Sequence, residues 1–430
     1  MSEPESQSLI DILKGNVGVL TWTRFILFFP MRMFWAYFPL YIIELGGNPE
    51  AIGLVQSLAS LTSLIIVPIG GYLADYYGRV RLIASAFYFR SIAFLIYALS
   101  GSWVTLAFGR FYQGLTEYNH AAQSAIMADS MRPGRRAMGF AALNTLPNMV
   151  TIIAPTVGAF MINHFGLELG SRYLLFICFI SMFFVGAGRH KFLKETIRPS
   201  TASKQISINN IGHFIREAYQ KSWEAIKWTP RSLSVFVITQ IITSFSGAMI
   251  GSFWVIYATT IIQLTITQWS LILFIEGVIT LFLSIPAGML VDRIGNRKII
   301  IIMLALAITP GILFIFSQTF LHTLIILVSL TIIAAFMTPA CHAFLADTVP
   351  RQMRARITSA YGRGGIGVRT GVGGGGGGYV LMIPSMIGSI LGGILYGINP
   401  IFPWLIQTGS LIISLLISVL FLKEPTVAEV

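Results

Sequence analysis

Residues 71–81 read GYLADYYGRVR, and we interpret them as a short polar loop between two long apolar runs. Residues 288–298 read GMLVDRIGNRK and form a second copy, in which Asp292 lies 292 − 75 = 217 residues after Asp75. Ala128-Asp129-Ser130 and Ala346-Asp347-Thr348 repeat in the same way, 347 − 129 = 218 residues apart. Two landmarks at nearly one offset, about half of the 430 residues, indicate two copies of one structural unit, as in many membrane transporters.

The composition indicates a membrane protein. Apolar residues make up 55% of the chain and charged residues 11%, whereas soluble domains usually contain about 25% charged residues. A helix that crosses a bilayer needs about 20 apolar residues, so the chain has room for roughly a dozen spans and no large soluble domain. Lipid offers no hydrogen-bond partner for unpaired backbone groups, so each span is expected to be a helix.

Twelve apolar runs are long enough to span, six on either side of a polar segment. The first six are 17–43, 51–74, 81–100, 103–128, 137–163 and 171–190. The second six are 231–260, 268–291, 298–317, 321–346, 379–398 and 401–422. We therefore predict an all-α membrane protein with two six-helix bundles, residues 1–190 and 231–430, joined by a linker, residues 191–230.

Most of the positive charge lies on one side of the predicted membrane. With both termini placed inside, the inner segments hold 24 of the 29 Lys and Arg residues, the outer loops hold only Arg172, and four lie within spans. This distribution predicts an even number of spans and two cytoplasmic termini. The formal charge of +12 is therefore a topology signal, and no nucleic-acid partner is expected.

Two inner segments depart from the repeat. The linker is basic and then amphipathic, which predicts either a helix in the inner membrane interface or a helix that ties the two halves together. Residues 362–378 end in six glycines and are predicted to form a flexible inner loop before the eleventh span. These glycines match no GxxxxGK[ST] motif, and Cys178 and Cys341 belong to no metal-spaced cluster, so no cofactor or metal is expected.

These motifs resemble those of a transporter family. Residues 71–81 are similar to the signature between helices 2 and 3 of the major facilitator superfamily, and residues 288–298 to its counterpart between helices 8 and 9. Residues 110–114, RFYQG, resemble the RxxxG pattern of proton-coupled members. Residues 154–159, APTVGA, resemble the GPxxGG element of the drug/proton antiporter branch and depart from it at two positions. The resemblance implies two pseudo-symmetric bundles, alternating access and a monomer.

The resemblance also implies an inner latch, a set of charged residues that holds the two halves together on the cytoplasmic side. Asp75 is expected to face the N-terminus of the eleventh helix, where the helix dipole favours a negative charge. Arg79 is expected to pair with Asp129 at the inner end of the fourth helix. Alternatively, these charges only fix the topology.

The second copy differs from the first at one position of this latch. Asp292 corresponds to Asp75, but Asn296 stands where the first copy has Arg79. The contact in the second half is therefore expected to be weaker, or to be made by Arg297 with Asp347.

Five ionisable residues inside predicted spans stand out, since a charge there is costly enough to indicate a function. They are Arg32, Arg90, Arg110, Glu117 and Glu276. Glu276 has no arginine or lysine clearly within the spans of its own half, so it either reaches across the interface or is protonated.

The fourth span carries a regular polar pattern. Arg110, Gln113, Glu117, His120 and Ser124 are spaced by three or four residues, which places them in one stripe on a continuous helix. The resemblance puts this helix beside the central cavity, together with the first, seventh and tenth. No ligand-spaced cluster accompanies His120, so we interpret it as a satisfied core histidine rather than a metal ligand.

Glu117 is the candidate proton carrier. It lies two helical turns, about 10 Å, from Arg110, so Arg32 or Arg90 on a neighbouring helix is the better partner. A carboxylate whose arginine partner moves between conformations binds a proton more tightly when the arginine leaves. Transport would then be coupled to protons, with Glu117 as the proton carrier and Arg110 as the residue that modulates it. The alternatives are a permanent ion pair and contact with the substrate.

These observations predict a secondary transporter of small molecules in the cytoplasmic membrane, with proton-coupled efflux as the leading hypothesis. Uptake of a small organic anion is the alternative, because Arg32, Arg90 and Arg110 outnumber Glu117 in the first-half spans. A membrane enzyme would need a nucleophile–base pair, a metal motif or a phosphate loop, and none stands out. The chain also contains no Walker sequence of the kind that an ATP-driven pump uses.

Overall fold

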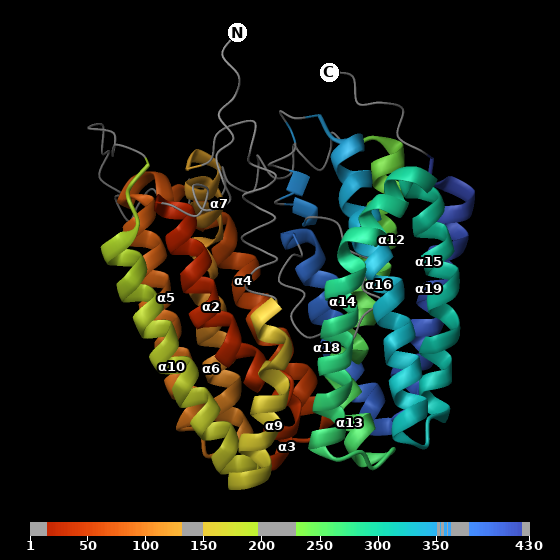
Figure 1. Cartoon of the computed structure of the whole chain (residues 1–430), viewed down its shortest axis with the longest axis horizontal. Coiled ribbons are helices and arrows are strands. Elements are labelled where there is room, and N and C mark those ends of the chain that lie inside the picture. Colours follow the sequence, from red (N-terminus) through yellow and green to blue (C-terminus); the bar gives the residue numbers. More distant parts are fainter. Residues whose placement is uncertain are drawn as a thin grey trace.

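The computed structural model describes residues 15–130, 149–196, 229–350, 353, 357–358, 360–362 and 378–423. The helices form two groups that stand side by side, the first half of the chain in red to yellow and the second in green to blue (Figure 1). We call the end of the molecule at which the first helix begins the inner end, and the opposite end the outer end. The predicted all-α membrane fold is confirmed.

The first group contains α2 (Gly15–Trp35), α3 (Phe38–Glu44), α4 (Pro49–Tyr77), α5 (Arg79–Ala98), α6 (Trp103–Leu115), η1 (Glu117–Asn119), α7 (His120–Asp129), η3 (Thr151–Ile153), α9 (Ala154–Phe165) and α10 (Leu167–Phe192). The second group contains α12 (Arg231–Gly251), α13 (Phe253–Thr260), α14 (Ile266–Ile294), α15 (Asn296–Leu313), η5 (Phe314–Phe316), α16 (Phe320–Thr348), α18 (Tyr379–Ile398) and α19 (Phe402–Phe421).

Ten of the twelve predicted spans lie on helices long and apolar enough to cross a membrane, counting only the described residues. The fourth span is interrupted, and the fifth is described only from Met149 onward. Most of the linker and most of the glycine-rich loop lie outside the described residues. The last glycine, Gly378, directly precedes α18.

The N-caps of four helices repeat the half-chain offset. In each case a side-chain oxygen accepts a hydrogen bond from the backbone N–H three residues later, which satisfies one of the donors that a helix start leaves free. Asn48 and Ser102 cap α4 and α6, and Thr265 and Thr319, each 217 residues further along, cap α14 and α16. The two halves therefore start their corresponding helices at the outer end in the same way.

The predicted polar loop at residues 71–81 is almost entirely helical, which corrects the sequence interpretation. Helix α4 continues to Tyr77, and only Gly78 separates it from α5. Gly295 separates α14 from α15 in the same way. Their φ angles of 84° and 98° lie in the left-handed region that favours glycine. One glycine is therefore enough to reverse the chain at the inner end of each half.

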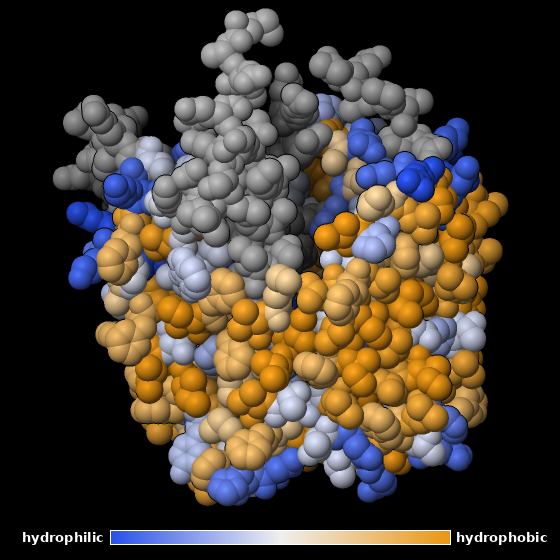
Figure 2. Space-filling model, viewed as in Figure 1, coloured by the Kyte–Doolittle hydropathy of each residue, from blue (hydrophilic) through white to orange (hydrophobic). Residues whose placement is uncertain are grey.

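An apolar band surrounds the molecule. On the face in view, Figure 2 shows hydrophobic residues across the middle and hydrophilic residues toward both ends. Large apolar side chains point outward on this band, and Phe282, for example, is 73% exposed. A water-facing surface would not tolerate a patch of this extent, so the protein is a multi-pass membrane protein.

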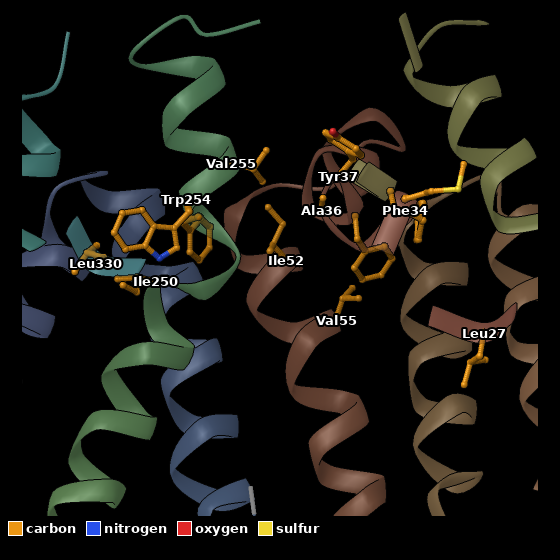
Figure 3. Close-up of a cluster of buried hydrophobic side chains, with 14 of the residues drawn as sticks. Leu27, Phe34, Ala36, Tyr37, Ile52, Val55, Ile250, Trp254, Val255 and Leu330 are labelled. Carbon is orange, nitrogen blue, oxygen red and sulfur yellow. The ribbon is translucent and has the colours of Figure 1, made fainter. Parts of the chain in front are cut away.

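The contacts between the halves gather near the outer end. A Cβ atom at Gly393 of α18 would lie 2.6 Å from the carbonyl oxygen of Pro49 and 3.3 Å from the Cα of Gly53, so α4 and α18 meet backbone to backbone. The side chains of Ile52 in α4 and Val255 in α13 face each other near this contact (Figure 3). The outer end is therefore closed by packing between small and apolar residues.

A second set of contacts between the halves is polar. Asn163 at the end of α9 donates a hydrogen bond to Thr267 at the start of α14, at 2.7 Å. Gln56 of α4 donates to Ser252, which lies at the break between α12 and α13, at 2.9 Å. Both contacts lie in the outer half of their helices and add to the closure of the outer end.

We predict that Gly393→Leu prevents this closure, because the larger side chain cannot fit against the backbone of α4. A cysteine placed at the buried position Ile52 should react with a membrane-impermeant maleimide about tenfold faster in the Gly393→Leu protein. Gly409→Leu is the matched control, since a Cβ at Gly409 meets no atom within 4 Å. Equal labelling in the two proteins would contradict the prediction.

Candidate functional site

The fourth span breaks at Thr116, deep in the first bundle. Helix α6 ends at Leu115, and α7 resumes the path only after the short turn of η1. Arg90 of α5 donates from Nη2 to the carbonyl oxygen of Thr116 and from Nε to its hydroxyl oxygen, both at 3.0 Å. The guanidinium thus satisfies a carbonyl that the end of α6 would leave unpaired within the membrane.

Glu117 lies next to this break and shares its carboxylate between two partners. Its Oε1 is 3.2 Å from Nη2 of Arg90, and its Oε2 contacts Nε2 of His120. The sequence left Arg32 and Arg90 open as partners, and the structure pairs Glu117 with Arg90. Arg32 lies partly buried in the last turn of α2. Glu117 therefore connects a buried arginine to a histidine at the start of α7.

Arg110 belongs to a separate network nearer the outer end. It donates to Gln113 at 2.9 Å and to Gln56 at 2.7 Å, while Tyr97 also donates to Gln113 at 2.7 Å. The guanidinium carbon lies 4.7 Å from the centre of the Trp35 ring. Through Gln56 and its bond to Ser252, this network reaches the second half of the molecule.

The predicted stripe on one continuous helix is therefore wrong. Gln113 is 6% exposed and faces Tyr97, whereas His120 is 57% exposed. The turn at Thr116 changes the phase of the helix, so residues on either side of it no longer share a face. The polar residues of the fourth span serve two networks, one centred on Arg110 and one on Glu117.

Glu276 is 1% exposed in α14. Thr331 of α16 donates a hydrogen bond to its Oε1 at 2.7 Å. This carboxyl group lies in the second bundle.

Arg189 is a buried charge that the sequence did not single out. It lies within α10 and is 0% exposed. Its guanidinium donates to Thr23 of α2 at 3.0 Å and to Gln123 of α7 at 3.2 Å. Its place at the end of an apolar run, before His190 and Lys191, gave no sign of burial.

The inner end of the first bundle holds the ion pair expected from the motif. The largely buried Arg79 contacts the exposed Asp129 and also donates to Thr196, which follows α10, at 2.9 Å. The pair joins elements of the same half. The side chain of Asp75 and residues 363–377 lie outside the described part of the chain. The contact of Asp75 with the eleventh helix therefore stays a prediction.

The second bundle holds a neutral version of this pair. Asn296 donates to Asp347 at 2.8 Å. Arg297 instead donates to the carbonyl oxygens of Leu422, at 2.5 Å, and Val419, at 3.3 Å, and so caps the end of α19. The sequence allowed either a weaker contact in this half or a contact of Arg297 with Asp347. The structure shows the weaker one, between Asn296 and Asp347. Asp292 is exposed in the last turn of α14.

Comparisons with known proteins find a matching family model, similar sequences and structures that share the fold. A family model described as the Major Facilitator Superfamily matches residues 20–233 and 236–430. The chain is similar to Multidrug resistance protein MdtG of Salmonella arizonae, with 26% identity over 340 residues that cover 75% of this chain and 78% of the relative.

Solved structures share the fold at low sequence identity. The nucleoside transporter NupG superimposes with a TM-score of 0.68 and 15% identity, covering 95% of this chain and 100% of that one. The human organic anion transporter MFSD10 superimposes with a TM-score of 0.61 and 15% identity, covering 96% of this chain and 100% of that one. At this sequence identity, the two structures show that the fold is shared and nothing about the transported molecule.

We predict that Arg90→Gln destabilises the protein by about 3–5 kcal/mol, because it leaves Glu117 and the Thr116 carbonyl without their buried cationic partner. The variant Glu168→Gln, which weakens the 2.8 Å ion pair of the exposed Glu168 with Arg172, should cost less than about 1 kcal/mol. Unfolding of the purified proteins measures both. The double variant Arg90→Gln/Glu117→Gln should lose less than the sum of the single variants, and additive losses would show that the two residues are not coupled.

A further prediction compares the two inner pairs. Asp129→Asn removes the charge opposite the largely buried Arg79 and should lower the free energy of unfolding by about 1.5–3 kcal/mol. Asp347→Asn keeps a hydrogen-bond acceptor for Asn296 and should cost less than about 1 kcal/mol. Equal losses would contradict the assignment of a charged pair to the first half and a neutral pair to the second.

Proposed function

Because this chain belongs to the Major Facilitator Superfamily, we propose that it exports small molecules by alternating access in exchange for protons. It is a multi-pass membrane transporter and not an enzyme. Export, proton coupling, the cytoplasmic membrane and the cytoplasmic position of both termini are parts of the proposal. The excess of Lys and Arg in the inner segments, 24 of 29, supports this orientation.

Export is supported by the relatives. MdtG carries the name Multidrug resistance protein, and 75% of this chain aligns with it. The closed outer end is the conformation in which an exporter would bind its cargo from the inside before the outer end opens. Separation of α4 from α18 at Gly53 and Gly393 would then release the cargo outside.

The single observation that supports proton coupling is the shared carboxylate of Glu117. Arg90 stabilises its ionised form, and His120 offers a second group that can hold a proton. The short turn of η1 places Glu117 outside the regular hydrogen bonding of both α6 and α7. We propose that a proton binds to the Glu117–His120 pair when the contact with Arg90 weakens, with Arg110 and Gln113 modulating the position of α6.

Uptake of a small organic anion is the second candidate. It is favoured by the excess of arginine over carboxylate inside the first bundle, and the MFSD10 structure, which shares the fold, is that of an organic anion transporter. Accumulation of the cargo inside rather than outside energised cells would favour this candidate.

The test of the proposed function uses Glu117→Gln in inside-out vesicles loaded with the pH-sensitive dye ACMA. Addition of ethidium or benzoate as trial cargo should release protons in the wild type, and Glu117→Gln should reduce this signal at least about tenfold. Exchange of labelled cargo without a gradient should persist in the variant, because exchange needs no net proton movement.

Glu168→Gln is the matched control, since it makes the same chemical change in an exposed pair at the outer end. It should keep both activities. Proton-coupled flux that survives in Glu117→Gln would show that Glu117 and Arg90 form a permanent ion pair instead.

A further inference from the structure

Helix α7 brings His120 to the carboxylate of Glu117, and the break in the fourth span separates this helix from α6. Helix α6 ends at Leu115, and the side chain of Asn119 makes no capping hydrogen bond to the start of α7. Asn119 is buried, and neither its amide nitrogen nor its amide oxygen has a hydrogen-bond partner among the described residues. Without a cap or a continuous helix before it, the start of α7 depends on tertiary contacts for its position.

Arg189 supplies such a contact. Its guanidinium donates a hydrogen bond to the side-chain oxygen of Gln123 on α7, at 3.2 Å. It also donates to the hydroxyl oxygen of Thr23 on α2, at 3.0 Å, and its central carbon lies 4.2 Å from the centre of the Phe87 ring on α5. Because Arg189 belongs to α10 and is 0% exposed, one buried side chain connects four helices of the first bundle.

The bond between Arg189 and Gln123 has a fixed direction. A guanidinium can only donate, so Gln123 turns its carbonyl oxygen to Arg189. The bond is charge-assisted and therefore stronger than a bond between two neutral groups. The donors of a guanidinium form a rigid, planar fork, and the contacts with Thr23 and Phe87 hold this fork in place. Arg189 is therefore a rigid anchor for α7.

Gln123 is well placed to transmit this anchoring to His120. It follows His120 by three residues, so the two side chains lie on one face of α7. The next polar side-chain contact of α7 among the described residues is that of Asp129 with Arg79, and Asp129 lies 129 − 120 = 9 residues after His120. A displacement of the start of α7 is therefore resisted first by the bond between Gln123 and Arg189.

The two partners of Glu117 are both positioned with respect to the ring of Phe87. The guanidinium carbon of Arg90 lies 5.4 Å from the centre of this ring, and Oε1 of Glu117 is 3.2 Å from Nη2 of Arg90. Oε2 of Glu117 contacts Nε2 of His120. Arg189 lies against the same ring and holds the helix that contains His120. A shift of α7 by about 1 Å is enough to disturb a contact of this kind.

We propose that Arg189 is a positioning residue for the proposed proton site. Through its bond to Gln123 it holds α7 where His120 reaches Glu117, and it thereby sets the separation of His120 from Arg90. Arg189 acts through α7, because its described contacts are with Thr23, Gln123 and Phe87. The inference rests on the proposed function, since it assigns a supporting residue to that same site.

The test measures the rate at which diethyl pyrocarbonate modifies His120 in the full-length protein in detergent, with mass spectrometry as the readout. The reagent needs a ring nitrogen with a free lone pair, and Nε2 of His120 instead donates its hydrogen to Glu117. Gln123→Leu removes the acceptor of Arg189 and should raise the rate about fivefold, and Glu117→Gln should have a similar effect. In the Glu117→Gln background, Gln123→Leu should cause no further rise, because the charge that holds His120 is already absent.

Three controls separate positioning from a general loosening of the fold. Gln123→Glu keeps an acceptor for Arg189 and should stay within about twofold of the wild-type rate. Ala121→Leu introduces the same leucine at an exposed position of α7 and should also stay within about twofold. His322 lies exposed in α16 of the second bundle and should keep its own rate in every variant.

Three results would overturn the proposal: an unchanged rate at His120 in Gln123→Leu or in Glu117→Gln, a rise from Gln123→Leu that persists in the Glu117→Gln background, and an equal rise at His322. The modification needs neither a gradient nor cargo, so a failure here leaves the proton-release test of Glu117→Gln unaffected. If the proton-release test fails instead, the modification rates still decide whether Arg189 positions His120 against Glu117.

Discussion

The hydrogen bonds from Arg90 to Thr116 are the interaction on which the candidate site depends. A membrane-spanning helix cannot break without a partner for the carbonyl groups that the break releases, since lipid supplies none. Arg90 provides this partner and at the same time approaches Glu117 at 3.2 Å. The cost of burying the arginine and the cost of breaking the helix are thereby reduced together. A carboxylate in the middle of the bundle becomes tolerable for the same reason.

The two halves share one architecture but differ in their chemistry. Corresponding helices start with equivalent caps and turn at Gly78 and Gly295. The first half holds charged contacts, such as Arg79 with Asp129, where the second half has Asn296 with Asp347. The internal repeat therefore preserves the helix caps and turns of the two halves, but not their charged contacts. Among the described residues, the buried charged side chains of the first half are Arg90 and Arg189, and that of the second half is Glu276.

The outer closure and the polar networks are connected through one side chain. Gln56 accepts a hydrogen bond from Arg110 in the first bundle and donates one to Ser252 in the second. Opening of the outer end would separate α4 from α12, so the environment of Arg110 would change with the conformation. This provides a physical path from the outer end to the fourth span, where Glu117 and Arg90 meet.

Hydropathy and the half-chain repeat were sufficient to predict the all-α fold and the ten spans that lie on long apolar helices among the described residues. Lipid permits only helices for such runs, so apolar length alone decides the element. The pairing of Arg79 with Asp129 also followed from the motif. The break at Thr116 did not, because a pattern of three and four residues assumes an uninterrupted helix.

The choice of Arg90 over Arg32, the burial of Arg189 and the single-residue turn at Gly78 were decided only by the tertiary structure. Each depends on how far apart two helices lie and which faces they turn to each other. Spacing along one chain contains no information about those distances. Sequence therefore determined which residues enter the membrane, and packing between helices determined which of them meet.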